Sequence, residues 1–367
     1  MKIVVISGIN IVDGGAKSVY DDLLDTIVKN RLYENEKFII LVSKKELFKK
    51  YTPFFEIIEF PKSKISWLNR IYYEYFYFKK LSKRIKPDIW LSMHDITPNV
   101  IAKKQYVYCH NPSPFYNMKF KDAKYGWKYY LFSKFYKYLY KININKNNAV
   151  IVQQQWMARS FDKMYNVKNI YVAKPSLKIG EIAPSNITSS KVYFIYPSFP
   201  RPFKNFETLC EAVKILNKKN LQKEFEVDIT LNGTENAYSK MLFKKYGAEA
   251  NINFIGLQPR KQLFKNYSKS NCLIFISNLE TWGMPISEYK QTSKPIITSD
   301  LPYAHETVGN YRNAKFIEKN NSEQLAKNMA DVINGNKFHS EFKLKCNKTY
   351  HEFNSWDSLI KEIFEER

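Results

Sequence analysis

Short apolar runs alternate with longer amphipathic segments along the whole of this 367-residue chain. Apolar runs of roughly four to eight residues are typical of strands buried on both faces of a parallel sheet. The pattern predicts strands over residues 2–7, 37–42, 55–60, 89–93, 105–109, 149–153, 191–196, 227–232, 252–255, 272–277 and 295–299. The segments between them have helical periodicity, so we expect the α/β class, with parallel sheets covered by helices.

The length of the chain predicts two domains, each large enough for its own core. Residues 174–190 contain two prolines and several serines and threonines, which makes them the best candidate for a linker. We therefore expect a first domain over 1–178, a linker over 179–190 and a second domain over 191–345. In the tail, 346–367, helical spacing relates Phe353, Trp356, Leu359, Ile360 and Ile363.

The most informative segment is 277–288, in which Glu280 and Glu288 flank a Gly283-Met284-Pro285 corner. A buried strand precedes this corner, and proline at a first helical position predicts a helix after it. Ligands of open α/β sheets bind at the carboxyl ends of the strands, and a helix start favours an anion. Two glutamates alone more often belong to a helix cap and a solvated face. The interpretation as a ligand site therefore depends on the Gly-Met-Pro corner and the strand before it.

This segment resembles the donor-site signature of family 4 retaining glycosyltransferases: a Glu, seven residues and a second Glu around a Gly-Leu-Pro. Met284 stands at the usual Leu, Thr281-Trp282 at the usual Gly-Phe, and Ser293 at a usual Gly. The resemblance covers nearly the whole chain. It implies the GT-B fold, two doubly wound Rossmann-like domains facing across a cleft, with the tail helix crossing back to the N-terminal domain.

The resemblance also implies roles for residues in the second domain. Glu288 would bind the ribose hydroxyls of a nucleotide sugar, and Glu280 would hold the sugar. Gly283, Met284 and Pro285 would form the donor-binding corner, and Leu257 would lie in the turn beside the nucleotide base. Because an Arg and a Lys suit a diphosphate, Arg201 and Lys204 in the loop after 191–196 are further catalytic candidates.

Candidate residues of the first domain follow two of its predicted strands. Gly14 and Gly15 come before a helical run from Lys17, where they would let a backbone approach a donor phosphate; a plain turn is the alternative reading. His110 follows the strand 105–109, and in the family a His at this place faces the transferred sugar. The chain contains neither G-x-G-x-x-G nor a P-loop, which argues against a nicotinamide enzyme and an ATPase.

The resemblance implies transfer of a hexose-type sugar from a UDP-, GDP- or dTDP-linked donor to a glycan or lipid-linked acceptor, in the biosynthesis of a bacterial surface polysaccharide such as capsule or lipopolysaccharide. It implies no cofactor and no metal, and the sequence has no Asp-x-Asp. The alternatives are an epimerase or phosphorylase of this fold, a sugar-nucleotide-binding protein that has lost catalysis, and a basic nucleic-acid-binding protein.

Charge bears on the partners of this protein. The net charge is +23, and most of the excess lies in residues 1–180. An AT-rich coding sequence, which favours lysine codons, is one explanation of this positive charge. Two stretches, 67–84 and 115–146, interleave aromatics with basic residues. Such stretches fit core packing, an anionic membrane surface or single-stranded nucleic acid, and no nucleic-acid module is recognised.

We therefore expect an enzyme that binds no nucleic acid. Four widely spaced cysteines predict buried free thiols rather than disulfides. No run is long enough to span a membrane, and no signal peptide is recognised. The expected location is the cytoplasm, peripheral at the inner face of the cell membrane.

Overall fold

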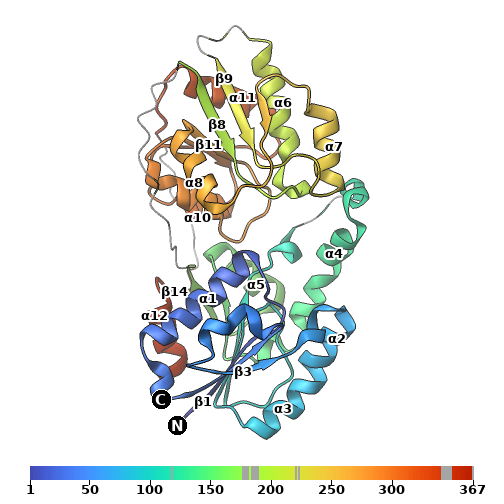
Figure 1. Cartoon of the computed structure of the whole chain (residues 1–367), viewed down its shortest axis with the longest axis vertical. Coiled ribbons are helices and arrows are strands. Elements are labelled where there is room, and N and C mark those ends of the chain that lie inside the picture. Colours follow the sequence, from blue (N-terminus) through green and yellow to red (C-terminus); the bar gives the residue numbers. More distant parts are fainter. Residues whose placement is uncertain are drawn as a thin grey trace. The chain divides into compact units, whose positions relative to one another are not determined.

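The structure, a computed structural model, describes residues 1–116, 118, 120–175, 182, 190–219, 221, 224–339 and 349–365. The chain forms two compact units (Figure 1). The first comprises Met1–Phe115, Lys134–Ser176 and Cys346–Arg367, and the second comprises Tyr116–Ser133 and Leu177–Lys345. Residues 116–133 therefore group with the second unit, although they lie inside the range expected for the first domain. Most of the expected linker, 179–190, lies outside the described residues.

The first unit is built on an eight-stranded parallel sheet of order β14-β7-β6-β5-β4-β1-β2-β3. Its strands are β1 (Ile3–Gly8), β2 (Lys37–Val42), β3 (Glu56–Glu59), β4 (Ile89–Ser92), β5 (Lys104–Cys109), β6 (Ala149–Val152), β7 (Ile170–Ala173) and β14 (His351–Phe353). Its helices are α1 (Gly14–Lys29), α2 (Trp67–Tyr72), the π-helical turn Tyr73–Tyr77, α3 (Phe78–Ile85), α5 (Gln155–Tyr165), α12 (Trp356–Ile360) and the π-helical turn Lys361–Glu365. Helix α4 (Trp127–Lys141) contains residues of both units.

The second unit is built on a six-stranded parallel sheet of order β10-β9-β8-β11-β12-β13. Its strands are β8 (Val192–Tyr196), β9 (Phe225–Ile229), β10 (Ile252–Phe254), β11 (Cys272–Phe275), β12 (Ile296–Ser299) and β13 (Ala314–Ile317). Its helices are α6 (Phe206–Asn217), α7 (Ala237–Tyr246), α8 (Arg260–Lys269), α9 (Met284–Tyr289), α10 (Pro302–Val308) and α11 (Ser322–Ile333). The predicted α/β class with two doubly wound parallel sheets is confirmed.

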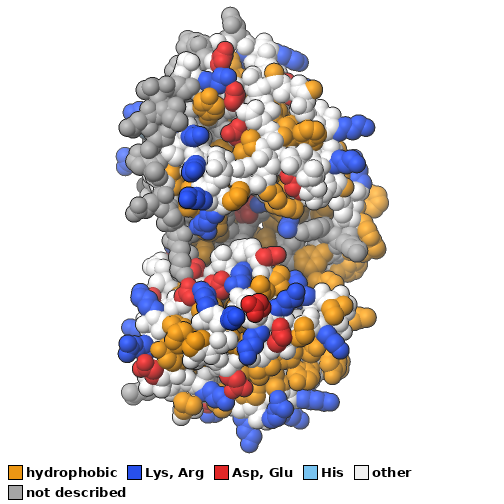
Figure 2. Space-filling view, in the orientation of Figure 1, with side chains coloured by type: hydrophobic (Ala, Val, Ile, Leu, Met, Phe, Trp, Pro, Cys, Tyr) orange, Lys and Arg blue, Asp and Glu red, His pale blue; other side chains and the backbone are white. Residues whose placement is uncertain are grey.

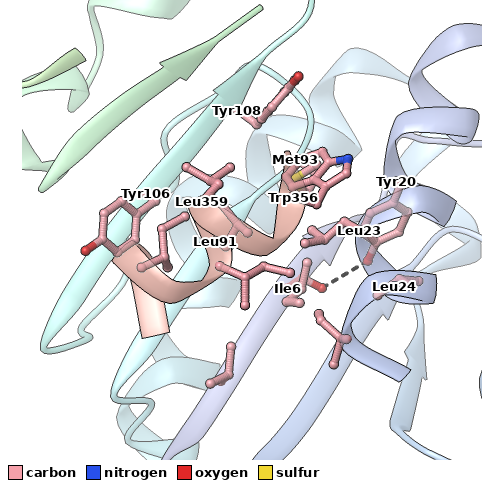
Figure 3. Close-up of a cluster of buried hydrophobic side chains, with 14 of the residues drawn as sticks. Ile6, Tyr20, Leu23, Leu24, Leu91, Met93, Tyr106, Tyr108, Trp356 and Leu359 are labelled. Atoms are coloured by element: carbon pink, nitrogen blue, oxygen red, sulfur yellow. Dashed lines mark hydrogen bonds between the residues drawn. The ribbon is translucent and has the colours of Figure 1, made fainter. Parts of the chain in front are cut away.

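The tail of the chain belongs to the core of the first unit. Trp356 and Leu359 of α12 lie among Leu91, Met93 and Tyr108 of the sheet (Figure 3). Strand β14 pairs in parallel with β7 at the edge of the sheet. About 350 residues separate this tail from β1, so only tertiary structure brings them into one core.

Three strands were not predicted: β7, β13 and β14. Each has three or four residues, and Lys315 in β13 and His351 and Glu352 in β14 interrupt the apolar run that indicates a buried strand. Phe353 lies in β14, so the helical stripe predicted for the tail begins only at Trp356. Helix α1 begins at Gly14 instead of near Lys17, so the two glycines occupy its first turn rather than a preceding loop.

The aromatic stretch 67–84 divides between core and surface. Arg70, Glu74, Phe78 and Leu81 form its buried side. On the opposite side Ile65, Leu68, Tyr72 and Phe76, spaced by three or four residues, are 73%, 77%, 52% and 62% exposed. We call these four residues the α2 face. Lysines 62, 64, 79, 80 and 83 flank it and are exposed, and Figure 2 shows hydrophobic and basic side chains gathered over this part of the surface.

Two further expectations concern cysteines and membrane spans. Cys109, Cys210 and Cys272 are buried free thiols, as predicted, whereas Cys346 lies outside the described residues. Within the described part of the chain, no helix combines the length and the apolar character that a transmembrane span requires.

Candidate functional site

The strand order of the second sheet brings two loops of the sequence together. Strand β8 comes first in this unit, and β9 and β11 lie on its two sides. The chain therefore leaves the carboxyl ends of β8 and β11 at the point where the strand order reverses. Open α/β sheets bind ligands at such a switch point. The loop after β8 contains Arg201 and Lys204, and the loop after β11 contains Glu280.

Lys204 and Glu280 form an ion pair across this switch point. The Lys204 ammonium group donates a hydrogen bond to Glu280 Oε1. The two side chains are only 14% and 16% exposed, so both are largely shielded from water. The ammonium group also lies 5.4 Å from the centre of the Phe275 ring. The structure thus brings together two of the four predicted catalytic side chains, 76 residues apart in sequence.

Backbone contacts hold the two loops in this arrangement. The Tyr196 hydroxyl donates to the carbonyl of Lys204, and the backbone N–H of Asn278 donates to the carbonyl of Phe203 over 2.7 Å. Asn205, with φ of 61°, ends the short 3₁₀ helix Pro202–Lys204 in a left-handed conformation. These bonds place the loops independently of the ion pair itself.

Arg201 is the N-cap residue that directly precedes the same 3₁₀ helix. Its guanidinium lies 5.6 Å from the ring centre of Phe199 and 5.9 Å from that of Phe203. At these distances the two aromatic rings interact favourably with the guanidinium charge and help to fix its position. Arg201 therefore shares a loop with Lys204, as the sequence indicated.

The Gly283-Met284-Pro285 corner turns the chain from the loop into α9. Gly283 has a φ of 87° and precedes the helix, with Pro285 in the first turn. A Cβ atom at Gly283 would approach Ile286 to 3.4 Å and Tyr303 to 3.5 Å. These are ordinary contacts, so the backbone conformation is what favours glycine here, and the helix starts where the proline predicted.

Glu288 lies on α9 and is largely buried, its side chain 8% exposed. Arg260 Nη2 lies 3.3 Å from Glu288 Oε1, and the Tyr267 hydroxyl donates to Oε2 over 3.2 Å. Burial raises the pKa of Glu288, and the positive charge of Arg260 opposes that rise. Both partners come from α8. The sequence reasoning missed Arg260, because nothing in its spacing relates it to Glu288.

Leu257 follows β10 in an exposed turn and is itself 53% exposed. Gly256 has a φ of 70°, and the Gln258 side chain donates to the carbonyl of Ile255 over 2.6 Å. The turn lies two strands from β8 in the sheet.

In the first unit, β1 lies between β2 and β4, so β1 and β4 flank a second switch point. Gly14 and Gly15 open α1 after β1, and a Cβ atom at either position would meet no other atom within 4 Å. Gly14 has a φ of 67°, which favours glycine. The backbone at the start of α1 is therefore accessible from outside.

His110 follows β5, the neighbour of β4. Its Nε2 lies 2.9 Å from the Met93 carbonyl oxygen, so this nitrogen carries the proton and donates. Burial lowers the pKa of His110 below its ordinary value, so the ring is neutral at pH 7. The Nδ1 atom is then an acceptor and lies 3.5 Å from the Gln153 amide nitrogen.

Asp95 holds the backbone of this loop. Its Oδ1 accepts from the N–H groups of His110 and Asn111 over 2.6 Å and 2.9 Å, and from the Tyr140 hydroxyl over 2.9 Å. Asp95 itself has a φ of 75°, uncommon for a residue with a side chain. These bonds give the Asp95 carboxylate a structural role in the loop that holds His110.

Among the described residues, no three His, Cys, Asp or Glu side chains cluster in a way that could hold a metal ion. The charged side chains described above for the second unit are Lys204, Arg201, Glu280 and the Glu288–Arg260 pair.

Residues 179–348, which contain this constellation, match the sequence family described as glycosyl transferases group 1. The matched region contains both β8 and β11, and hence both loops of the switch point. The resemblance seen in the sequence is confirmed at this level.

Two curated bacterial proteins are similar to this chain. It is 23% identical over 232 residues to the poly(ribitol-phosphate) alpha-N-acetylglucosaminyltransferase of Staphylococcus aureus, covering 63% of this chain and 46% of that protein. It is 24% identical over 247 residues to the O-antigen chain mannosyltransferase RfbU of Salmonella typhimurium, covering 65% of each. The matched regions thus span less than two thirds of the length of either relative.

Solved structures share the fold of the chain. The glycosyltransferase of Rickettsia africae aligns with a TM-score of 0.64 at 16% identity, covering 91% of this chain and 89% of the other. HepE of Anabaena, solved in complex with UDP and glucose, aligns with a TM-score of 0.60 at 13% identity, covering 90% and 89%. The fold is therefore that of GT-B glycosyltransferases, as expected.

Proposed function

We propose that this protein is a retaining glycosyltransferase that moves a hexose-type sugar from a nucleoside diphosphate sugar to a glycan or lipid-linked acceptor. The observation that carries the proposal is the Lys204–Glu280 pair at the switch point of the second sheet. An ammonium group beside a carboxylate offers positive charge to a diphosphate and negative charge to a sugar at one place. The family match covers both loops.

In this reaction the bond between the anomeric carbon and the donor diphosphate breaks as the acceptor oxygen bonds to that carbon. Negative charge then grows on the leaving diphosphate, and a fixed positive group stabilises it most in the transition state. Lys204 and Arg201 serve that role. Glu280 holds the sugar hydroxyls and stabilises the oxocarbenium-like carbon. A diphosphate oxygen takes the proton of the acceptor.

The remaining candidates bind the ends of the donor. Glu288 accepts hydrogen bonds from the ribose hydroxyls, and Leu257 and its turn border the base. Gly283, Met284 and Pro285 form the wall beside the diphosphate. In the first unit, Gly14 and Gly15 open their backbone to donor phosphate and His110 meets the transferred sugar as a neutral ring.

The named relatives act on poly(ribitol phosphate) and on an O-antigen chain, which supports an acceptor in surface-polysaccharide biosynthesis. Such acceptors are assembled at membranes. The α2 face fits this location, because four exposed apolar side chains flanked by five lysines suit an anionic lipid surface. We place the enzyme at the inner face of the cell membrane, held peripherally.

The donor assignment is tested by melting the purified protein with UDP, GDP and dTDP, and with their glucose, mannose and N-acetylglucosamine conjugates. A ligand of the folded state raises the melting temperature by mass action. One nucleotide should do so, and single-stranded DNA should not. Turnover by Lys204→Ala and by Glu280→Ala should fall about a hundredfold to a thousandfold, the loss expected when a main transition-state contact disappears.

Lys240→Ala, which removes an exposed lysine of α7, is the matched control and should transfer sugar normally. Near-normal turnover in both site variants would overturn the proposal, as would stabilisation by DNA alone.

Membrane binding is tested by flotation with vesicles that contain phosphatidylglycerol. Leu68→Ser with Phe76→Ser should abolish flotation, whereas Leu47→Ser, at an exposed leucine outside the α2 face, should not. Equal flotation of wild type, the double variant and the Leu47→Ser control would refute the proposal that the α2 face binds lipid.

A further inference from the structure

Arg260 reaches from the first residue of α8 to the carboxylate of Glu288 on α9. The two side chains differ sharply in environment: Arg260 is 53% exposed and Glu288 is 8% exposed. The guanidinium also lies 5.2 Å from the ring centre of Phe264, one turn further along α8. An exposed arginine is thus oriented by its own helix and directed at the one buried carboxylate to which we assign ribose binding.

We infer that Arg260 is a positioning residue of the donor site, which holds the Glu288 carboxylate ionised and oriented to receive the ribose hydroxyls. The inference rests on the proposed function, because it takes Glu288 as the ribose-binding group. It adds a residue that the sequence motif does not contain and that acts through Glu288 rather than on the reacting atoms.

The geometry leaves room for this role. A carboxylate has about four acceptor positions, two on each oxygen. The Tyr267 hydroxyl donates to Oε2, and Arg260 Nη2 lies 3.3 Å from Oε1 as an ion-pair partner. Two side chains of α8 thus contact the two oxygens separately, and acceptor capacity remains for the vicinal hydroxyls of a ribose. Contacts on both oxygens restrict rotation of the carboxylate.

Charge supports the same conclusion. A buried carboxyl group that lost its proton would be costly without a nearby cation. The titratable groups that act on Glu288 are Arg260 and Tyr267, both on α8. The neighbouring side chains of its own helix end are directed elsewhere: the Tyr289 hydroxyl lies 3.0 Å from Ser270 Oγ, and Lys290 donates to the carbonyl of Thr307 over 2.8 Å. Arg260 is therefore the cation that offsets the burial of this carboxylate.

A rival explanation is that Arg260 simply attracts phosphate from the surface. Lys261 tests it, since this exposed neighbour carries the same charge in the same turn of α8. The two explanations differ in what they predict for a ligand without ribose hydroxyls. A phosphate attractor binds such a ligand as well as the natural one, whereas a positioning residue matters only when the hydroxyls are present.

The experiment measures, by calorimetry, the affinity of the preferred nucleoside diphosphate and of its 2′,3′-dideoxy analogue for wild type, Arg260→Gln, Arg260→Lys and Lys261→Gln. In Arg260→Gln the affinity for the ribonucleotide should fall about tenfold, the effect of ~1.4 kcal/mol, while the affinity for the dideoxy analogue should change less than about twofold. Arg260→Lys should restore part of the loss, and Lys261→Gln should behave as wild type.

The pH profile gives a readout that a general folding defect would not move. Without Arg260 the pKa of Glu288 rises further. As the pH is lowered from 8, the ratio of ribonucleotide to dideoxy affinity should therefore begin to drop at a higher pH in Arg260→Gln than in wild type. Because the ionisation of the ligand's own phosphate is common to both ligands, it cancels in this ratio.

The outcomes separate the inference from the proposed function. If wild type binds no nucleoside diphosphate, the proposed function fails. If wild type binds and prefers the ribonucleotide, but Arg260→Gln loses equal affinity for both ligands or none for either, the inference fails and the donor site stands. A loss for Lys261→Gln equal to that for Arg260→Gln would likewise assign Arg260 to phosphate attraction and overturn the inference.

Discussion

Truncating Leu359 to alanine tests whether the tail is an integral part of the first unit. Leu359 lies in α12 with an exposed fraction of 0% and belongs to the same buried cluster as Leu91 and Trp356 (Figure 3). Leu→Ala changes in cores cost roughly 2–5 kcal/mol, made up of lost transfer free energy and a residual cavity. We expect about 3 kcal/mol for this site, since the sheet residues and Trp356 pack in the same buried cluster and limit its collapse.

In a domain of this size each kcal/mol lowers the melting temperature by roughly 2–4 °C, so the first unit should melt roughly 6–12 °C earlier. Scanning calorimetry measures this directly, and the nucleotide-stabilised transition identifies the second unit. Lys361→Ala, an exposed position two residues further on, should melt like wild type. If Leu359→Ala also melts like wild type, the tail contributes little to this core and the reasoning is wrong.

Two further predictions concern single positions. Burial raises the pKa of Glu74 to about 8, so the folded state binds this proton more tightly than the unfolded state and loses stability as pH rises from the ordinary value of 4.5 towards 8. The difference in melting temperature between Glu74→Gln and wild type should therefore shift in favour of the variant between pH 5 and pH 7.5. A difference that stays constant across this range would contradict the raised pKa of Glu74. Gly283→Ala imposes a side chain on a φ of 87° and should cost ~1–2 kcal/mol, measured by urea denaturation; unchanged stability would show that the corner does not require glycine.

Local patterns determined much of this protein. Eleven of the strands follow from apolar runs in the sequence, because a strand buried on both faces must be apolar along its length. The helix start at Met284 follows from Pro285, which suits the first turn of a helix. The Glu280–Glu288 spacing around the corner was sufficient to indicate the family, since that spacing depends only on one loop and one helix.

Tertiary structure decided what those local patterns could not. The pairing of Lys204 with Glu280 depends on β8 and β11 lying side by side, an order that no single strand encodes. The contact between Arg260 and Glu288 depends on how α8 packs beside α9. The placement of Trp356 and Leu359 in the first core joins segments at opposite ends of the chain. The periodicity of a segment indicates which of its side chains are buried. It does not indicate which other segments they contact, because that depends on the order in which the strands of the whole sheet pair.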